Sequence, residues 1–162
     1  MSDLPVNHLV DRLSEKLFDK KWLLSTAESC TGGMISAAIT SKAGSSSVFD
    51  RGFVTYSNEA KMDMLSVSAE TLAQYGAVSE QTAIEMTKGA LKNSRAHIAV
   101  SVTGIAGPDG GSKDKPVGLV YIGYGLKGGV IQSTKHNFTG NREDVRTQTT
   151  KEALKHLLSI IK

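Results

Sequence analysis

The chain has 162 residues, of which 40% are hydrophobic and 22% are charged, as is typical of one globular domain of about 100–200 residues. Its nineteen basic and sixteen acidic residues are scattered along the sequence and leave a net charge of +3, and the only cysteine is Cys30. These values exclude a disulfide scaffold and a low-complexity chain, and no basic stripe predicts a nucleic-acid partner.

The N-terminal segment and the apolar segments indicate a cytoplasmic protein. Residues 1–5 lack the basic and apolar regions with which a secretory signal peptide begins. No apolar run approaches the roughly eighteen residues that a membrane-spanning helix needs. We therefore expect a cytoplasmic location without membrane contact.

Hydrophobic periodicity predicts that strands alternate with helices in the first half of the chain. Buried or half-buried strands are expected over 22–27 and 48–56. The turn after the first strand leads directly into a helix, for which Thr31 is the expected N-cap. The helices of this half are expected over 6–18, 33–41, 59–65 and 68–75, and a longer one begins at Ser79.

The second half of the chain predicts one more buried strand, a hairpin and a final helix. The strand over 97–102 ends in a glycine-rich segment, and the hairpin joins strands over 118–124 and 130–138. Asn141 is the expected N-cap of the last helix. This order predicts a single α/β domain over 1–162 with three α/β/α layers, a mixed and mostly parallel sheet, and a C-terminal hairpin plus helix.

Two familiar kinds of site are not expected. Residues 123–128 match the pattern G-x-G-x-x-G, but a dinucleotide site needs a helix after the glycines, and here a second strand of the hairpin follows. A phosphate loop is also missing, because no Gly-Lys-Ser/Thr occurs in the sequence. The four histidines are isolated in sequence, so we expect no metal site; they are His8, His97, His136 and His156.

Three polar stretches each follow a predicted strand, over 28–33, 55–61 and 103–111. In an open α/β sheet, ligands bind outside the carboxyl ends of the strands. A single glycine-rich turn is explained by chain geometry alone. Three such stretches that converge on one edge of the sheet predict a ligand site.

Ser29 is the candidate nucleophile in the first stretch. It lies in a turn just before a helix, where the backbone N–H groups of Gly32 and Gly33 could stabilise a developing oxyanion. Cys30 is a second candidate, but strand alternation points its side chain away from that of Ser29, and we interpret it as a small core residue.

A serine nucleophile needs a base, and no histidine lies near the three stretches. Lys61 could serve if burial lowered the pKa of its amine, and Tyr56 could relay the proton or orient that amine. The residue type alone leaves a second interpretation open, in which Lys61 is an ordinary solvated helix lysine.

Several long motifs follow one another along nearly the whole chain. They are AESCTGG (27–33), GFVTYSNEAK (52–61), GAVSE (76–80), TGIAGPDGG (103–111), KPVG (115–118) and FTGNR (138–142). Together they resemble the C-terminal domain family of the competence-damage-inducible protein CinA, and within it the stand-alone nicotinamide-nucleotide amidases.

The resemblance implies hydrolysis of the carboxamide of nicotinamide mononucleotide (NMN) to nicotinate mononucleotide and ammonia, without a metal or other cofactor. Carried over by motif, Ser29 is the nucleophile, with Lys61 and Tyr56 as its activating partners. The resemblance also implies a homodimer. Further substrate-binding residues are expected at Gly32, Gly33, Thr103, Gly104, Gly107 and Arg142.

The roles of two of these residues follow from their side chains. We expect Thr103 to make a polar contact to the substrate, and Arg142 to contact the phosphate or the developing carboxylate. A catalytically silent nucleotide-binding or interaction module on the same scaffold is the alternative function.

Overall fold

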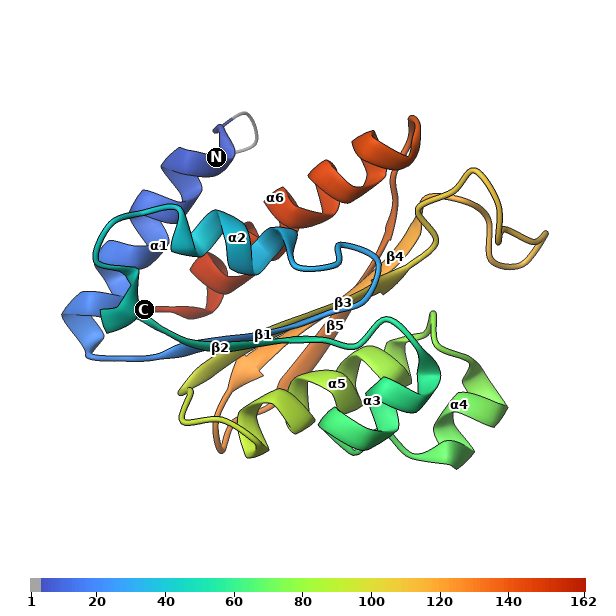
Figure 1. Cartoon of the computed structure of the whole chain (residues 1–162), viewed down its shortest axis with the longest axis horizontal. Helices are drawn as coiled ribbons and strands as arrows, with labels where there is room; N and C mark the ends of the chain where they lie inside the picture. Colours follow the sequence, from blue (N-terminus) through green and yellow to red (C-terminus); the bar gives the residue numbers. More distant parts are fainter. Residues whose placement is uncertain (1–3) are drawn as a thin grey trace.

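A single five-stranded sheet runs through the computed structural model of the chain (Figure 1), in the spatial order β2-β1-β3-β4-β5. The structure describes residues 4–162, so Met1 to Asp3, part of the segment that argued against a signal peptide, lie outside the described residues. The strands are β1 (Leu24–Glu28), β2 (Phe49–Val54), β3 (Ile98–Gly104), β4 (Leu119–Leu126) and β5 (Ile131–Asn137).

Helices cover both faces of this sheet, which confirms the predicted three-layer α/β/α domain. In Figure 1, α1, α2 and α6 lie on one side of the sheet, and α3, α4 and α5 lie on the other. The helices are α1 (Val6–Lys20), α2 (Met34–Thr40), α3 (Asn58–Leu65), α4 (Ala69–Tyr75), α5 (Glu80–Lys92) and α6 (Arg142–Ile160).

The predicted mixed sheet with a C-terminal hairpin is also confirmed. Strand β1 pairs in parallel with β2 and with β3, whereas β4 pairs antiparallel with both β3 and β5. β4 is therefore the one strand that runs against the others. The glycines of 123–128 lie in β4 and in the turn that follows it, as the hairpin interpretation predicted.

Strand register places the ends of the first three parallel strands side by side. Glu28, the last residue of β1, is level with Val54 of β2 and with Val102 of β3. The polar stretches that follow these strands thus begin at one edge of the sheet, as the sequence predicted.

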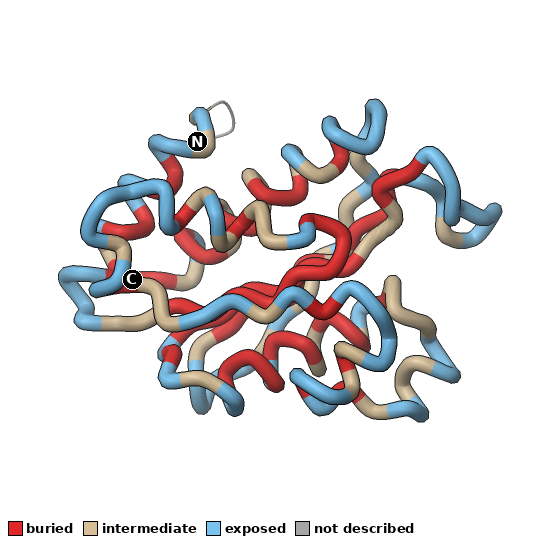
Figure 2. The backbone as a smooth tube through the Cα atoms, viewed as in Figure 1, coloured by how far each residue is buried: buried red, intermediate tan, exposed pale blue. Residues whose placement is uncertain are grey.

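The apolar side chains form two cores, one on each face of the sheet. The larger core packs α1, α2 and α6 against one face, and includes Leu13, Ile35, Val100 and Leu157. The smaller core lies under α3 and α5 and includes Leu65 and Met86. Figure 2 shows the resulting pattern, in which the middle of the sheet and the inner sides of the helices are buried.

Side-chain caps fix where most helices begin. Ser68, Ser79 and Asn141 accept hydrogen bonds from the first turns of α4, α5 and α6, which confirms the predicted cap at Asn141. The prediction that Thr31 caps α2 is wrong. The residue before α2 is Gly33, whose φ of 112° suits glycine, and no side chain caps the helix from that position.

The expectation of isolated histidines is wrong for one pair. The Nε2 atoms of His136 in β5 and His156 in α6 lie 3.1 Å apart. In the part of the chain that the structure describes, no helix is both long and apolar enough to cross a membrane.

Gly89 allows α3 to approach α5 closely. A Cβ atom at this position would collide with the backbone carbonyl of Leu65, the last residue of α3. Since α3 also carries Lys61, this contact helps to place a predicted site residue against the sheet.

Gly89→Ala is therefore expected to destabilise the protein by about 2 kcal/mol through overpacking. The same change in an exposed helix interior would stabilise by about 1 kcal/mol. Urea unfolding of the variant and the wild type measures the difference. A variant as stable as the wild type would contradict the close contact between α3 and α5.

Candidate active site

A pocket of about 250 Å³ lies where the three polar stretches meet. Its lining residues come from the ends of β1 and β3, from α3 and the segment before it, from the segment before α5, and from the first residue of α6. The predicted site residues in this lining are Ser29, Tyr56, Lys61, Thr103, Gly104 and Arg142. Cys30, Asn58, Ala77, Val78 and Ala106 complete it.

Ser29 and Lys61 are in contact inside this pocket. The amine Nζ of Lys61 lies 3.1 Å from the hydroxyl Oγ of Ser29. Nζ also lies 3.0 Å from the carbonyl oxygen of Thr55 and 3.4 Å from that of Tyr56. In a neutral amine, two N–H groups can donate to the two carbonyls, and the lone pair is then left to accept the serine proton.

The surroundings of Lys61 favour this neutral form. Its side chain is only 1% exposed, and burial lowers the pKa of its amine below the ordinary value of 10.5. Among residues 4–162, no acidic side chain forms an ion pair with it. The interpretation of Lys61 as a solvated lysine is therefore wrong, since α3 turns this residue inward.

Tyr56 and Arg142 lie at the open rim of the pocket. Tyr56 is 63% exposed, and its hydroxyl lies 3.3 Å from a guanidinium nitrogen of Arg142. Arg142 also donates to the carbonyl oxygen of Gly107 over 2.8 Å. Tyr56 thus reaches Lys61 through its backbone carbonyl, whereas its phenol contacts Arg142, which favours an orienting role over a proton relay.

Cys30 has the core role that the sequence predicted. Its side chain belongs to the larger apolar core. Burial raises the pKa of its thiol to about 12, so the thiol stays protonated and is a poor nucleophile. Of the two adjacent candidates, Ser29 alone contacts a base.

Glu28 fixes the turn that carries Ser29, because its buried carboxylate accepts hydrogen bonds from the first turn of α2. One oxygen, Oε1, accepts from the backbone N–H of Ile35 over 2.8 Å and from the hydroxyl of Thr31 over 2.6 Å. The other, Oε2, accepts from the backbone N–H and the hydroxyl of Ser36 over 3.0 and 2.7 Å. Glu28 therefore takes the N-terminal donors of α2 that a substrate anion could otherwise use.

This arrangement leaves Gly32 and Gly33 outside the pocket lining. The N–H of Gly32 donates to the carbonyl oxygen of Ser29 over 3.1 Å. Arg146 holds the same turn from the other side, because its guanidinium donates to the carbonyl oxygens of Cys30 and Thr31, each over 3.1 Å.

The glycine-rich segment after β3 supports the pocket through backbone contacts. Thr103 is buried, and its hydroxyl donates to the carbonyl oxygen of Ala77 over 2.8 Å. This bond holds the segment before α5 against the end of β3. Gly104 lines the pocket, whereas Gly107 lies outside the lining and contributes the carbonyl that holds Arg142.

Sequence reasoning missed the positioning roles of Glu28 and Arg146. Glu28 was visible as a charged residue at the end of a buried strand, which is a signal for a specific partner. Arg146 gave no comparable signal, because one arginine in a polar helical turn is ordinary.

A larger hollow of about 590 Å³ lies elsewhere, between α1 and the segment around Lys42. It contains Ser14 and Ser47, but no lysine or histidine contact comparable to that of Ser29. The smaller pocket is therefore the candidate active site.

A buried serine and lysine in contact at the strand ends of a three-layer α/β domain define a candidate serine hydrolase scaffold. The sequence model described as the CinA C-terminal domain matches residues 6–161. The chain belongs to this family, as its motifs predicted.

Three relatives illustrate the similarity. The nicotinamide-nucleotide amidohydrolase PncC of Enterobacter agglomerans is 54% identical over 91% of this chain and 90% of its own length. The protein of the same name from Escherichia coli strain K12 is 50% identical over 97% of this chain and 95% of its own length. The crystal structure of the competence/damage inducible protein CihA from Agrobacterium tumefaciens has a TM-score of 0.95 at 47% identity, with all of both chains covered.

Glu28→Gln tests the anchor of α2. A glutamine NH₂ group would face a backbone or hydroxyl donor that the carboxylate now accepts, so we expect a loss of about 2 kcal/mol in the free energy of unfolding. Glu59→Gln, at an exposed position in α3, is the matched control. Urea unfolding at neutral pH measures both, and equal midpoints would show that the carboxylate does not anchor the helix.

Proposed function

We propose that this protein is an amidohydrolase that converts NMN and water to nicotinate mononucleotide and ammonia. The observation that carries the proposal is the 3.1 Å contact between Lys61 Nζ and Ser29 Oγ inside the pocket. The names of the two amidohydrolase relatives, which align with almost the whole chain, support the choice of substrate.

The reaction begins when Ser29 Oγ attacks the carboxamide carbon while Lys61 takes the hydroxyl proton. Lys61 then gives this proton to the departing amide nitrogen, which leaves as ammonia, and an ester to Ser29 remains. Water attacks the ester carbon, Lys61 accepts its proton and returns it to Ser29 Oγ, and the nicotinate nucleotide is released. The carbonyls of Thr55 and Tyr56 hold the amine in position throughout.

The oxyanion needs a donor other than the two glycines first considered. Among residues 4–162, the backbone N–H of Cys30 donates to no backbone carbonyl, and Cys30 belongs to the pocket lining. It directly follows the nucleophile, so its N–H is our candidate for stabilising the tetrahedral intermediate.

Arg142 is the candidate contact for the substrate phosphate. The pocket, at about 250 Å³, is slightly smaller than the about 300–1,000 Å³ that ligand sites typically measure. We place the nicotinamide ring inside the pocket and the phosphate toward the rim, where Arg142 and Tyr56 meet. The guanidinium has five N–H donors, of which Gly107 and Tyr56 use two. The homodimer, the cytoplasmic location and the absence of a nucleic-acid partner stay predictions.

Ser29→Ala removes the nucleophile and should lower NMN turnover by at least about a thousandfold, with little change in stability. Ammonia release from the purified protein measures turnover. Ser46→Ala, at an exposed position in the short 3-10 helix Ser45–Ser47, is the control and should keep full activity. Ammonia release by Ser29→Ala at the wild-type rate would exclude this serine, and no release by the wild type would favour the silent binding module.

The proposed base makes activity dependent on pH in a defined direction. Only neutral Lys61 can accept the proton, so kcat/KM should rise with pH and level off above its pKa, which burial places below 10.5. Lys61→Arg should be inactive across the range, because a guanidinium stays protonated. Exposed Lys88→Arg is the matched control, and wild-type activity in Lys61→Arg would rule out the lysine as base.

A further inference from the structure

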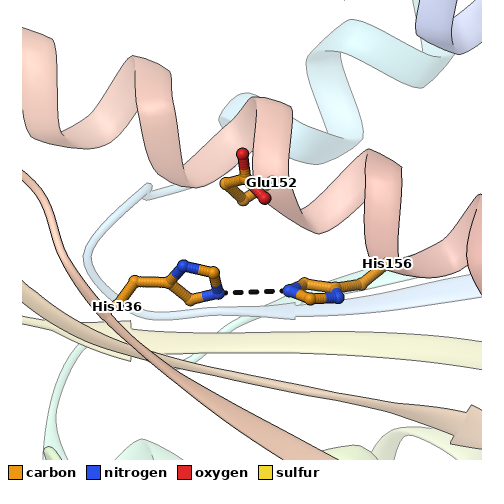
Figure 3. A group of neighbouring side chains, drawn as sticks. All are labelled: His136, Glu152 and His156. Carbon is orange, nitrogen blue, oxygen red and sulfur yellow. Dashed lines mark hydrogen bonds between the residues drawn. The ribbon is translucent and has the colours of Figure 1, made fainter. Parts of the chain in front are cut away.

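A second cluster of chemically reactive side chains lies between β5 and α6, away from the pocket. It contains His136 from β5 and Glu152 and His156 from α6 (Figure 3). One ligand atom from each residue lies within 4.8 Å of the other two. Fourteen helical positions separate His156 from Arg142 at the pocket rim, which is about 21 Å along the helix axis.

Regular secondary structure brings these side chains together. Glu152 and His156 are four residues apart in α6, so they lie on one face of the helix. Thr134 and His136 are two residues apart in β5, so they share the sheet face that α6 covers. Thr134 Oγ1 lies 3.2 Å from Nε2 of His136 and 2.9 Å from Nε2 of His156.

Aromatic neighbours hold both imidazoles in place. The ring of Tyr124 stacks on His156 with centroids 4.5 Å apart, and the ring of Phe138 stacks on His136 with centroids 5.1 Å apart. In Figure 3 the two histidine rings approach each other edge to edge, with Glu152 beside them. The two Nε2 atoms are 3.1 Å apart.

We propose that His136, Glu152 and His156 form a binding site for a divalent transition-metal ion, with Zn²⁺ as the best match. Two imidazoles and one carboxylate are a known protein ligand set for zinc. Two nitrogens at about 2.0–2.1 Å from one tetrahedral ion lie about 3.3 Å apart, close to the 3.1 Å between the two Nε2 atoms here. Mg²⁺ and Ca²⁺ are disfavoured, because they prefer oxygen ligands.

The cluster remains accessible to an ion from solution. All three side chains are half-buried, and the side chain of Glu152 is 29% exposed. Glu152 Oε1 accepts from Lys155 over 3.1 Å, and the carboxylate keeps a second oxygen for the metal. The fourth position is left to water or to the hydroxyl of Thr134.

Without metal, the Nε2–H of one histidine can donate a hydrogen bond to the Nε2 of the other. When both Nε2 atoms bind metal, each ring carries its proton on Nδ1. The bound ion would join the edge strand β5 to α6, so it should stabilise the folded chain by mass action. This role is structural and does not depend on the proposed amidase reaction.

Calorimetric titration of the chelator-treated full chain with ZnCl₂ tests the site. We expect one Zn²⁺ per chain, and binding at least about tenfold weaker in His156→Gln. His8→Gln removes an exposed imidazole from α1 and is the matched control, with wild-type affinity. Failure of the wild type to bind, or equal affinities in the two variants, would overturn the proposal.

A second measurement covers the case in which His156→Gln does not fold. Glu152→Gln keeps the shape of a half-buried side chain and should also weaken Zn²⁺ binding by about tenfold or more. CoCl₂ should give the wild type the visible absorption of four-coordinate Co²⁺, and Ser29→Ala should show the same spectrum because its change lies in the other site. A Co²⁺ spectrum that is altered by Ser29→Ala but not by Glu152→Gln would place the ion elsewhere and refute the site.

Discussion

The hydrogen bonds of one buried carboxylate hold the candidate active site together. Glu28 ends β1, and its two oxygens accept from the first turn of α2 and from the Thr31 hydroxyl. The strand and the helix are thereby fixed at a set distance, and Ser29 lies in the turn between them. Burial of an ionised group is unfavourable unless hydrogen bonds compensate for it, and here four donors do so. The backbone that carries the nucleophile is thus held by Glu28 on one side and by Arg146 on the other.

The second requirement of the site is a lysine that has lost contact with water. Serine needs a neutral base, and an amine is neutral near physiological pH only if its surroundings disfavour its charge. Helix α3 meets this requirement by packing against α5 at Gly89, which presses the buried face of α3, including Lys61, toward the sheet. Two backbone carbonyls then bind the amine without supplying the negative charge that would raise its pKa.

Local sequence patterns predicted much of this structure. The features that they did not predict depend on contacts between residues that lie farther apart in the sequence. Caps such as Ser79 and Asn141 depend on neighbouring residues, so they could be identified from the sequence. Convergence of the strand ends followed from the rule for parallel strands. The Thr31 cap failed because the Thr31 hydroxyl donates to the buried carboxylate of Glu28, and this carboxylate itself accepts from the first turn of α2. His136 lies at the end of β5 and His156 lies near the end of α6, twenty positions later, and no sequence period connects the two residues.

The wide separation in sequence of the parts of the pocket has a consequence for biosynthesis. Ser29 lies early in the chain, whereas Arg142 and Arg146, which hold the rim and the nucleophile turn, lie 113 and 117 positions later in the first turns of α6. A nascent chain that still lacks this last helix has its serine and lysine but not the arginines that complete the pocket. Assembly of the site therefore requires synthesis of α6, and a chain cut short before α6 lacks part of its pocket as well as part of its core.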